Sequence, residues 1–331
     1  MFIYYFLYML FFSTPLFTQI HNPILNIDKV VIWGHKLHSH THSYVHAAFF
    51  NAFKNLGYDT YWFDDYDDIT NFDFSHTLFL TEGQVDANTP MRNDCFYILH
   101  NCSSTKYLKF INCGKAITLQ VFTYDCITCC VDIIQKDEYI YESMKGHIIF
   151  MPWATDILPY QIEENKKNIK NIKKENTIYY VGSICGGIFG NIDQIFPFND
   201  ACKEYNIDFI NLKNINFKDH VDCIQKSFCA PSIVGRWQQQ VGYIPCRVLK
   251  NVSYGQYPVT NSREINNFFH GRTIYNEDTY QLVHDAKKQL PLISWQEMVE
   301  LMDFIQEKHT YINRIKSLLD FLTRSYIIYN F

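Results

Sequence analysis

The sequence predicts an α/β fold with two doubly wound domains that face each other across a cleft. The chain has 331 residues, which is more than one hydrophobic core usually holds. From Lys29 onward, short apolar runs alternate with amphipathic stretches, a cadence typical of βα units that form a parallel sheet. The cadence stops at residues 152–176, where prolines and then charges replace the apolar runs, and it resumes afterwards.

This interruption sets the expected domain boundaries. Residues 28–155 are expected to form a first Rossmann-like domain, and residues 177–331 a second one that ends in helices. Residues 156–176 are interpreted as a linker that contains the hinge. The basic stretch from Lys166 to Lys174 has no apolar face, so we expect the linker to be solvated.

Residues 1–27 form an apolar N-terminal segment that admits several interpretations. Its first part, residues 1–17, carries no charge, is short for a membrane span and lacks the basic start of a signal peptide. A signal-anchor, a cleaved signal and a false start upstream of Met9 all remain open. The expected location is therefore the cytoplasm or a membrane surface, with association through residues 1–17.

The first domain is expected to contain six strands, each bounded by turn residues or polar residues. The helix after the first strand has apolar residues at helical spacing from Tyr44 to Leu56, and Gly57 suits the position just past its end. The strands are expected at residues 29–33, 58–63, 77–80, 95–100, 117–122 and 147–151.

The second domain repeats the pattern and then changes to helices. From about Asn276 the sequence predicts three helices, with an apolar stripe that includes Trp295, Met298 and Ile305. The strands before them are expected at residues 177–182, 207–212, 227–233, 257–261 and 272–276.

Composition limits the classes of function. Apolar residues make up 47% of the chain and charged residues 19%, which is typical of a folded protein. A net charge of −5 without a Lys/Arg stripe argues against a nucleic-acid partner. The eleven cysteines are scattered and odd in number, and the CxxCC at residues 126–130 has no second pair, so we expect reduced thiols and no zinc site there.

A phosphate site is predicted at the start of a short helix in the second domain. Pro245 suits the first position of this helix and Gly255 the position after its last residue, which leaves free N–H groups and a positive dipole end toward the cleft. Arg247 in the first turn can bind a phosphate bidentately, whereas the alternative for an exposed arginine is a surface salt bridge. Gly182 and Gly186 belong to a glycine-rich loop that either approaches a phosphate or forms a plain turn.

Five histidines within residues 35–46 follow the first strand, where the cleft of the first domain is expected. His40 and His42 lie at a helix N-terminus, which disfavours imidazolium and keeps a neutral base available near pH 7. They are the candidate catalytic bases. His42 and His46 are also spaced to share a metal, but no HExxH or paired cysteines accompany them, so no metal is expected. Solvated histidines are the remaining alternative.

Further polar residues end other strands of the first domain and are candidate acceptor ligands. Glu82 and Gln84 follow the third strand, and His100 ends the fourth. Together with His35 and His46 they could hydrogen-bond sugar or acceptor hydroxyls. A capped turn is the alternative interpretation for Glu82 and Gln84.

Three stretches resemble the GT-B glycosyltransferases: GYIPCRVLKNVSYGQYPVTNS at residues 242–262, MPWATD at 151–156 and TIYYVGSI at 177–184. In that fold, the first stretch would correspond to the donor helix, glycine and strand that bind a nucleotide sugar. The stretches WGHKLHSHTHSYVH, TEGQVD, ILHNC and WQQQVGYIPCRVLKNVSYG also resemble uncharacterised glycosyltransferase-like proteins of large DNA viruses.

The resemblance assigns donor-binding positions, with one departure. Tyr243, Arg247, Lys250 and Ser253 fall within the donor stretch, and Arg247 is similar in position to the basic residue that fucosyltransferase-type members direct at the diphosphate. Many retaining members carry a ribose-binding Glu where this chain has Lys250. The ribose-binding role therefore does not carry over.

The resemblance implies a transferase that moves a sugar from a nucleoside-diphosphate sugar to a hydroxyl of a glycan, protein or small molecule. We expect inversion, with a histidine of the first loop as the base, and no required metal or other cofactor. A nucleotide-sugar epimerase of the same fold and a catalytically inert binding protein are the alternatives. An epimerase would need acid and base carboxylates in the cleft, where Glu82 is the obvious candidate.

Overall fold

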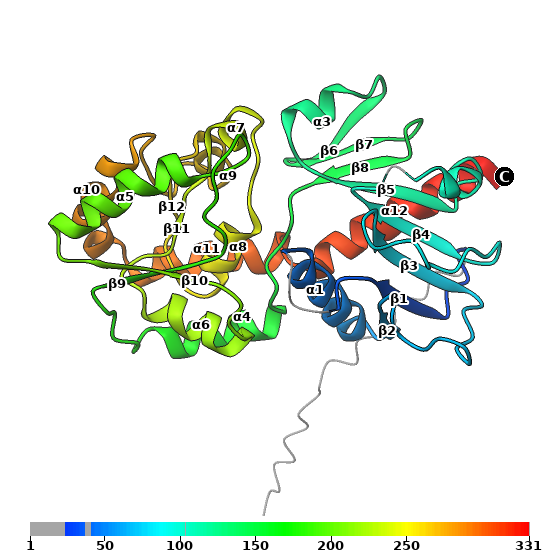
Figure 1. The fold of residues 1–331 in the computed structure, drawn as a ribbon, viewed down its shortest axis with the longest axis horizontal. Helices are drawn as coiled ribbons and strands as arrows, with labels where there is room; N and C mark the ends of the chain where they lie inside the picture. Colours follow the sequence, from blue (N-terminus) through cyan, green and yellow to red (C-terminus); the bar gives the residue numbers. More distant parts are fainter. Residues whose placement is uncertain (1–23, 37–40, 103, 331) are drawn as a thin grey trace, which may run out of the picture.

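The computed structural model describes residues 24–36, 41–102 and 104–330. These residues form two α/β units that lie side by side (Figure 1). The apolar segment at residues 1–17 and the candidate base His40 lie outside the described residues. In the part that is described, no helix has the length and apolar character needed to cross a membrane.

The first unit is built on an eight-stranded sheet in the order β2-β1-β3-β4-β5-β8-β7-β6. The strands from β2 to β8 in this order are parallel, while β7 and β6 add an antiparallel edge. Each of the six predicted strands is present. The strands are β1 Lys29–Trp33, β2 Asp59–Phe63, β3 Thr77–Glu82, β4 Phe96–His100, β5 Ala116–Val121, β6 Ile133–Asp137, β7 Ile140–Ser143 and β8 Ile148–Met151.

Both faces of this sheet are covered, as expected of a parallel sheet. On β1, Val30 and Ile32 belong to one apolar cluster, while Val31 and Trp33 belong to another on the opposite face. The first cluster includes residues of α1 Thr41–Asn55 and α12 Tyr311–Asn330, and the second includes residues of η1 Thr105–Tyr107 and α2 Leu108–Ile111.

The last helix differs from the expected domain assignment. The sequence predicts all terminal helices in the second domain, yet α12 returns to the first unit and packs beside α1 (Figure 1). Its apolar residues Ile315, Leu318 and Leu322 belong to the core of the first sheet. The apolar face of α12 fits the sheet of the first unit. This contact joins segments far apart in the chain, so local hydrophobic periodicity does not predict it.

The hairpin β6–β7 was not predicted from the sequence. Most of β6 is exposed, and the strand carries Lys136 and Asp137, so it lacks the apolar run that marks a buried strand. Strand β6 pairs with β7 at the sheet edge, next to α3 Tyr124–Thr128 (Figure 1).

The second unit also contains parallel strands at each of the five predicted places. Strands β9 and β10 form one pair, and β11, β12 and β13 form a second parallel group. The backbone N–H of Phe228 donates to the carbonyl of Thr177, which links the two groups. The strands are β9 Thr177–Val181, β10 Asp208–Leu212, β11 Pro231–Ser232, β12 Val259–Thr260 and β13 Ile274–Tyr275.

The helices of the second unit surround these strands (Figure 1). Three helices, α10, α11 and α12, follow residue 276, as predicted, with the short η2 between α10 and α11. The elements are α5 Ile192–Glu204, α6 Phe217–Lys226, α7 Arg236–Gln240, α8 Cys246–Ser253, α9 Arg263–Phe268, α10 Thr279–Gln289, η2 Leu290–Leu292 and α11 Trp295–Lys308.

The segment predicted as a solvated linker contains a packed helix, α4 Pro159–Ile169. Ile162 and Ile169 are buried in the core of the second unit, and Lys166 forms ion pairs with Glu163 and Asp303. The two isoleucines are seven residues apart and lie on the same face of the helix. Because the residues between them are mostly polar or charged, the sequence does not indicate this apolar face.

Candidate functional site

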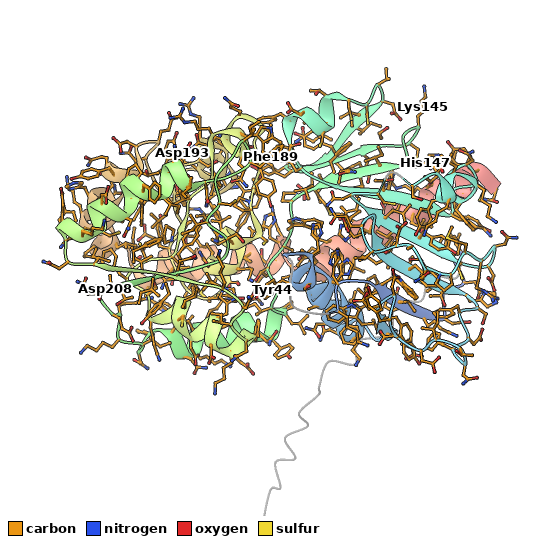
Figure 2. The ribbon with its side chains drawn as sticks, in the orientation of Figure 1. Tyr44, Lys145, His147, Phe189, Asp193 and Asp208 are labelled. Carbon is orange, nitrogen blue, oxygen red and sulfur yellow. The ribbon has the colours of Figure 1, made fainter. Side chains whose placement is uncertain are left out.

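A cavity of about 320 Å³ lies between the two units. Tyr44 of α1 lines it from the first unit, and Phe189 of the loop after β9 lines it from the second. Figure 2 labels both residues at the junction of the halves. The cavity therefore occupies the position expected for ligands in open α/β sheets, beyond the carboxyl ends of strands.

The helix α8 begins at this cavity. Pro245, with φ −72° and ψ 144°, is the N-cap residue rather than the first helical residue, and it lines the cavity with Cys246 and Arg247. Gly255 follows the helix with φ +90°, the left-handed conformation that glycine adopts without strain. The amino end of α8 therefore points its positive dipole end toward the cavity.

The Arg247 guanidinium is fixed by an aromatic ring and not by an acid. Its central carbon lies 4.1 Å from the centroid of the Tyr180 ring, and it donates a hydrogen bond to the Tyr180 hydroxyl. The Asn191 side-chain amide donates to the same hydroxyl at 2.8 Å. Among the described residues, no carboxylate lies within ion-pair distance of Arg247, and no Asp or Glu lines the cavity.

Lys250, by contrast, has a carboxylate partner. Its ammonium lies 2.9 Å from a carboxylate oxygen of Asp156 and 4.9 Å from the centroid of the Tyr44 ring. The Tyr254 hydroxyl donates to the other Asp156 oxygen at 2.5 Å. Lys250 therefore joins the segment between the units, α8 and α1.

The other predicted donor residues separate into two groups. Gly182 and Tyr243 line the cavity. Gly186 is exposed and does not line it, and Ser253 is buried, where its hydroxyl lies 2.6 Å from that of Thr155. Ser253 therefore contributes to packing between α8 and the segment that joins the units.

Four histidines and an acid converge at the carboxyl ends of β1, β3 and β4. His46 and His100 are fully buried, and their Nε2 atoms lie 2.8 Å apart. The Nδ1 of His46 lies 2.8 Å from the carbonyl oxygen of Gly34, so this nitrogen is the donor. The shared contact then makes His100 donate its Nε2–H to His46 if both rings are neutral.

Burial keeps both of these rings neutral. Desolvation lowers the pKa of His46 to about 3 and moves the pKa of His100 well below its usual value. The neighbouring histidines act in the same direction, although the Gly34 carbonyl opposes the shift at His46.

Glu82 lies at the centre of the group with 0% of its surface exposed. One carboxylate oxygen is 3.2 Å from Nε2 of His35 and accepts the Gln84 backbone N–H at 2.9 Å. The other oxygen is 3.9 Å from Nδ1 of His42. The predicted residues His35, His42, His46, Glu82 and His100 thus form one cluster, while the Gln84 side chain is exposed.

Several residues in and around the cavity are not predicted from the sequence. Tyr180, Asn191 and Asp156 hold the side chains described above, and His220 of α6 lines the cavity. Tyr180 and Asp156 lie within the stretches TIYYVGSI and MPWATD, but no local spacing indicates their partners, because sheet order and helix packing bring them to the site. Trp237 contacts Phe189 edge to face, with 4.8 Å between ring centroids.

Comparisons with known proteins give a structural likeness only. No family model matches the sequence, and no curated protein matches it. An alpha-glucosyltransferase in complex with UDP and a 13-mer DNA with a central A:G mismatch has a TM-score of 0.56 at 11% identity, over 89% of this chain and 99% of that chain. An alpha-glucosyltransferase complex with UDP and a 13-mer DNA containing a HMU base has a TM-score of 0.52 at 10% identity, over the same shares of the two chains.

A third solved structure is similar over the same part of this chain. AviGT4, a glycosyltransferase involved in avilamycin A biosynthesis, has a TM-score of 0.51 at 9% identity and is covered over 98% of its length, against 89% of this chain. The predicted fold class is therefore confirmed: this chain has the two-domain α/β fold of GT-B glycosyltransferases.

Proposed function

We propose that this protein is a glycosyltransferase that moves a sugar from a nucleoside-diphosphate sugar to an acceptor hydroxyl. The observation that carries the proposal is the Arg247 guanidinium, which lines an interdomain cavity beside the open end of α8 without a carboxylate partner in the described residues. An anionic ligand supplies the missing counter-charge. The structural neighbours that contain UDP make UDP-sugars the first donors to test.

In this proposal, Arg247 and the first amide groups of α8 neutralise the diphosphate as it leaves. Lys213, an exposed residue that lines the same cavity, adds a second cation. Fixed protein charges then perform the task that a metal performs in other transferases, so the donor half requires no metal. Gly182 and Tyr243 contact the donor beside them, while Lys250 acts through Asp156 and Tyr44.

The acceptor side is assigned to the histidine cluster. His42 is the proposed base, and the carboxylate of Glu82 orients its ring from 3.9 Å. Tyr44, two residues further along α1, lines the cavity, which brings the base and the donor to the same helix end. His35 and Gln84 contact the acceptor. His46 and His100 are fully buried, so they position the other rings. Direct attack with His42 as base inverts the anomeric centre.

The acceptor class follows from charge. A net charge of −5 favours a glycan, protein or small molecule over nucleic acid. Two structural neighbours contain DNA, so a DNA duplex belongs in the acceptor panel as a test of this preference. The resemblance to viral glycosyltransferase-like proteins depends on the sequence stretches alone and does not identify an acceptor.

The epimerase alternative is less well supported. It requires carboxylates at the reacting sugar, and no described Asp or Glu lines the cavity.

The first experiment measures release of nucleoside diphosphate from UDP-, GDP- and other nucleotide sugars, with and without acceptors. We expect Arg247→Ala to lower kcat/KM by roughly 10²- to 10³-fold, because it removes a charge aimed at the leaving group. Arg247→Lys keeps the charge but loses the fork, and is expected to recover only part of the rate.

Arg263→Ala is the matched control, because Arg263 pairs with Glu277 on the surface with 75% of its side chain exposed. It should behave like the unmodified protein. Turnover of the donor without an acceptor product would favour the epimerase or hydrolysis. Equal rates for Arg247→Ala and Arg263→Ala would remove Arg247 from the mechanism.

A further inference from the structure

We infer that His35, His42 and Glu82 form a binding site for a divalent transition-metal ion of the zinc class. One potential ligand atom from each side chain lies within 4.8 Å of the other two. The three residues come from different segments: the loop after β1, the first turn of α1 and the end of β3. Their convergence is therefore a property of the fold and not of a local sequence motif.

The charge balance at Glu82 points to a cation. The side chain is fully buried, and no Lys or Arg of the described residues lies within ion-pair distance of it. Its Oε1 atom accepts no hydrogen bond from any group in the described part of the chain. A buried carboxylate without a fixed cation is costly. A metal ion between Glu82 and the two rings would supply the missing charge.

The ligand set suits zinc. Two imidazole nitrogens and one carboxylate oxygen are typical ligands of Zn²⁺, with bonds of about 2.0–2.2 Å and a remaining open position. Such bonds bring ligand atoms to within about 3.5 Å of each other, so small rotations of the two imidazoles close the 4.8 Å set. The His35 and His42 side chains are 9% and 14% exposed, which leaves a route for the ion.

The surrounding groups are arranged as an outer shell. The Gln84 backbone N–H donates to the Glu82 oxygen that faces His35, at 2.9 Å, and so fixes the carboxylate. The His46 ring packs edge to face against His35, with 5.2 Å between centroids. Hydrogen bonds and packing of this kind orient metal ligands and increase affinity.

A bound ion would change the chemistry of His42, an effect that rests on the proposed function. In a neutral imidazole one nitrogen carries the proton, and only the other has an in-plane lone pair that can bind a proton or a metal ion. When the ion takes that lone pair, the other nitrogen carries the proton, so the ring cannot accept a proton from the acceptor. Zinc is therefore expected to inhibit transfer. Because its ligand His35 is also proposed to contact the acceptor, the inhibition should compete with the acceptor and not with the donor at Arg247.

The binding test uses the full chain after treatment with a chelator and removal of the chelator. Zn²⁺ is titrated by calorimetry into the unmodified protein, His35→Ala, Glu82→Gln and His270→Ala. His270, with 51% of its side chain exposed, is the control for loss of a surface histidine. We expect one equivalent to bind to the unmodified protein and to His270→Ala, and affinity to fall at least tenfold in the other two variants.

The eleven cysteines require a second readout, because thiolates also bind zinc. Co²⁺ replaces Zn²⁺ and reports its ligands by visible absorption. Bands without thiolate charge transfer, retained in Cys126→Ser and Cys129→Ser, would support the site. Thiolate charge transfer, or unchanged zinc affinity in both His35→Ala and Glu82→Gln, would overturn it. Circular dichroism of each variant, together with Glu82→Asp as a milder change, separates loss of ligand from loss of fold.

The two proposals can fail separately. Zinc binding at this site without any glycosyl transfer keeps the metal site and removes the proposed function. Transfer by a protein that binds no zinc keeps the function and removes the site. Stimulation of transfer by Zn²⁺ would overturn the expected inhibition.

Discussion

At the scale of single residues, His220 shows how the cavity is matched to an anion. Its ring packs edge to face on Tyr254, with 5.6 Å between centroids, and lines the cavity near Lys250 and Arg247. Burial is the main cause that lowers the pKa of His220 to about 3, and the two cations add to it while Asp156 opposes. A neutral His220 leaves Arg247, Lys213 and Lys250 as the cations that line the cavity, and of these Lys250 is paired with Asp156.

The lowered pKa makes stability depend on pH. The folded value lies below the unfolded value of 6.5, so the unfolded chain binds the proton first as the pH falls. Well above pH 6.5, His220 therefore does not change the free energy of unfolding. Between pH 6.5 and about 3, proton binding to His220 in the unfolded chain lowers the free energy of unfolding progressively. Between about pH 7.5 and about pH 5.5, we expect the free energy of unfolding to fall by about 1.4 kcal/mol less in His220→Gln than in the unmodified protein. Urea unfolding at the two pH values measures this difference.

His270→Gln serves as the control for this experiment, because the side chain is half exposed on the surface. It should keep the pH dependence of the unmodified protein. An identical pH dependence in His220→Gln would mean that His220 binds a proton as readily in the folded state as in the unfolded chain.

At the scale of elements, α8 owes its position to its two ends. Pro245 opens it at the cavity, and Gly255 ends it in the left-handed conformation. A Cβ atom on Gly255 would overlap the side chain of Ile169 at the end of α4. The absence of a side chain at Gly255 thus allows α8 to pack closely against α4.

Two glycine substitutions separate backbone conformation from packing. Gly271 also has a positive φ, +78°, but nothing lies within 4 Å of a Cβ placed there. We expect Gly271→Ala to cost about 1–2 kcal/mol for the left-handed conformation alone. Gly255→Ala should cost roughly 1–3 kcal/mol more because of the overlap with Ile169.

Chemical unfolding of both variants measures the difference, and donor affinity reports whether the amino end of α8 has moved. Equal losses in the two variants would show that α4 adapts without strain. The placement of α8 would then depend on other contacts.

At the scale of the whole molecule, the two units are joined by two chain crossings held together by Arg314. The backbone of Thr155 in the first crossing donates to the carbonyl of His309 in the second, at 3.0 Å. Arg314 donates to the carbonyls of Pro152 at 2.8 Å and Trp153 at 3.2 Å. Burial lowers the pKa of Arg314 to about 10, and no described carboxylate pairs with it.

Arg314→Lys tests this junction. Lysine keeps a charge but cannot reach several carbonyls at once, so buried acceptors lose their partner, and we expect a loss of roughly 2–5 kcal/mol in the free energy of unfolding. Arg324→Lys is the control, since Arg324 pairs with Glu142 and Asp320 while 31% exposed, and it should cost under about 1 kcal/mol. A similar loss in the two variants, measured by chemical unfolding, would mean that Arg314 does not hold the crossings.

Only those residues of the candidate site that a single local segment indicates could be predicted from the sequence. The strand ends at Glu82 and His100, the first turn of α1 and the short helix at Arg247 follow from hydrophobic cadence and from the rule that parallel strands present their carboxyl ends together. The partners of these residues were not predictable. Tyr180 for Arg247 and Asp156 for Lys250 are separated from them by 67 and 94 positions and meet only through sheet order and helix packing.

The sequence by itself determined the alternation of strands and helices, because burial on both faces of a parallel sheet demands continuous apolar runs that are visible locally. Only the tertiary structure decided that α12 covers the first sheet, that α4 packs on the second unit and that His35, His42 and Glu82 converge. Each of these depends on contacts between segments far apart in the chain. The stability of these contacts depends on how well the two surfaces fit each other, and a local sequence pattern does not predict that fit.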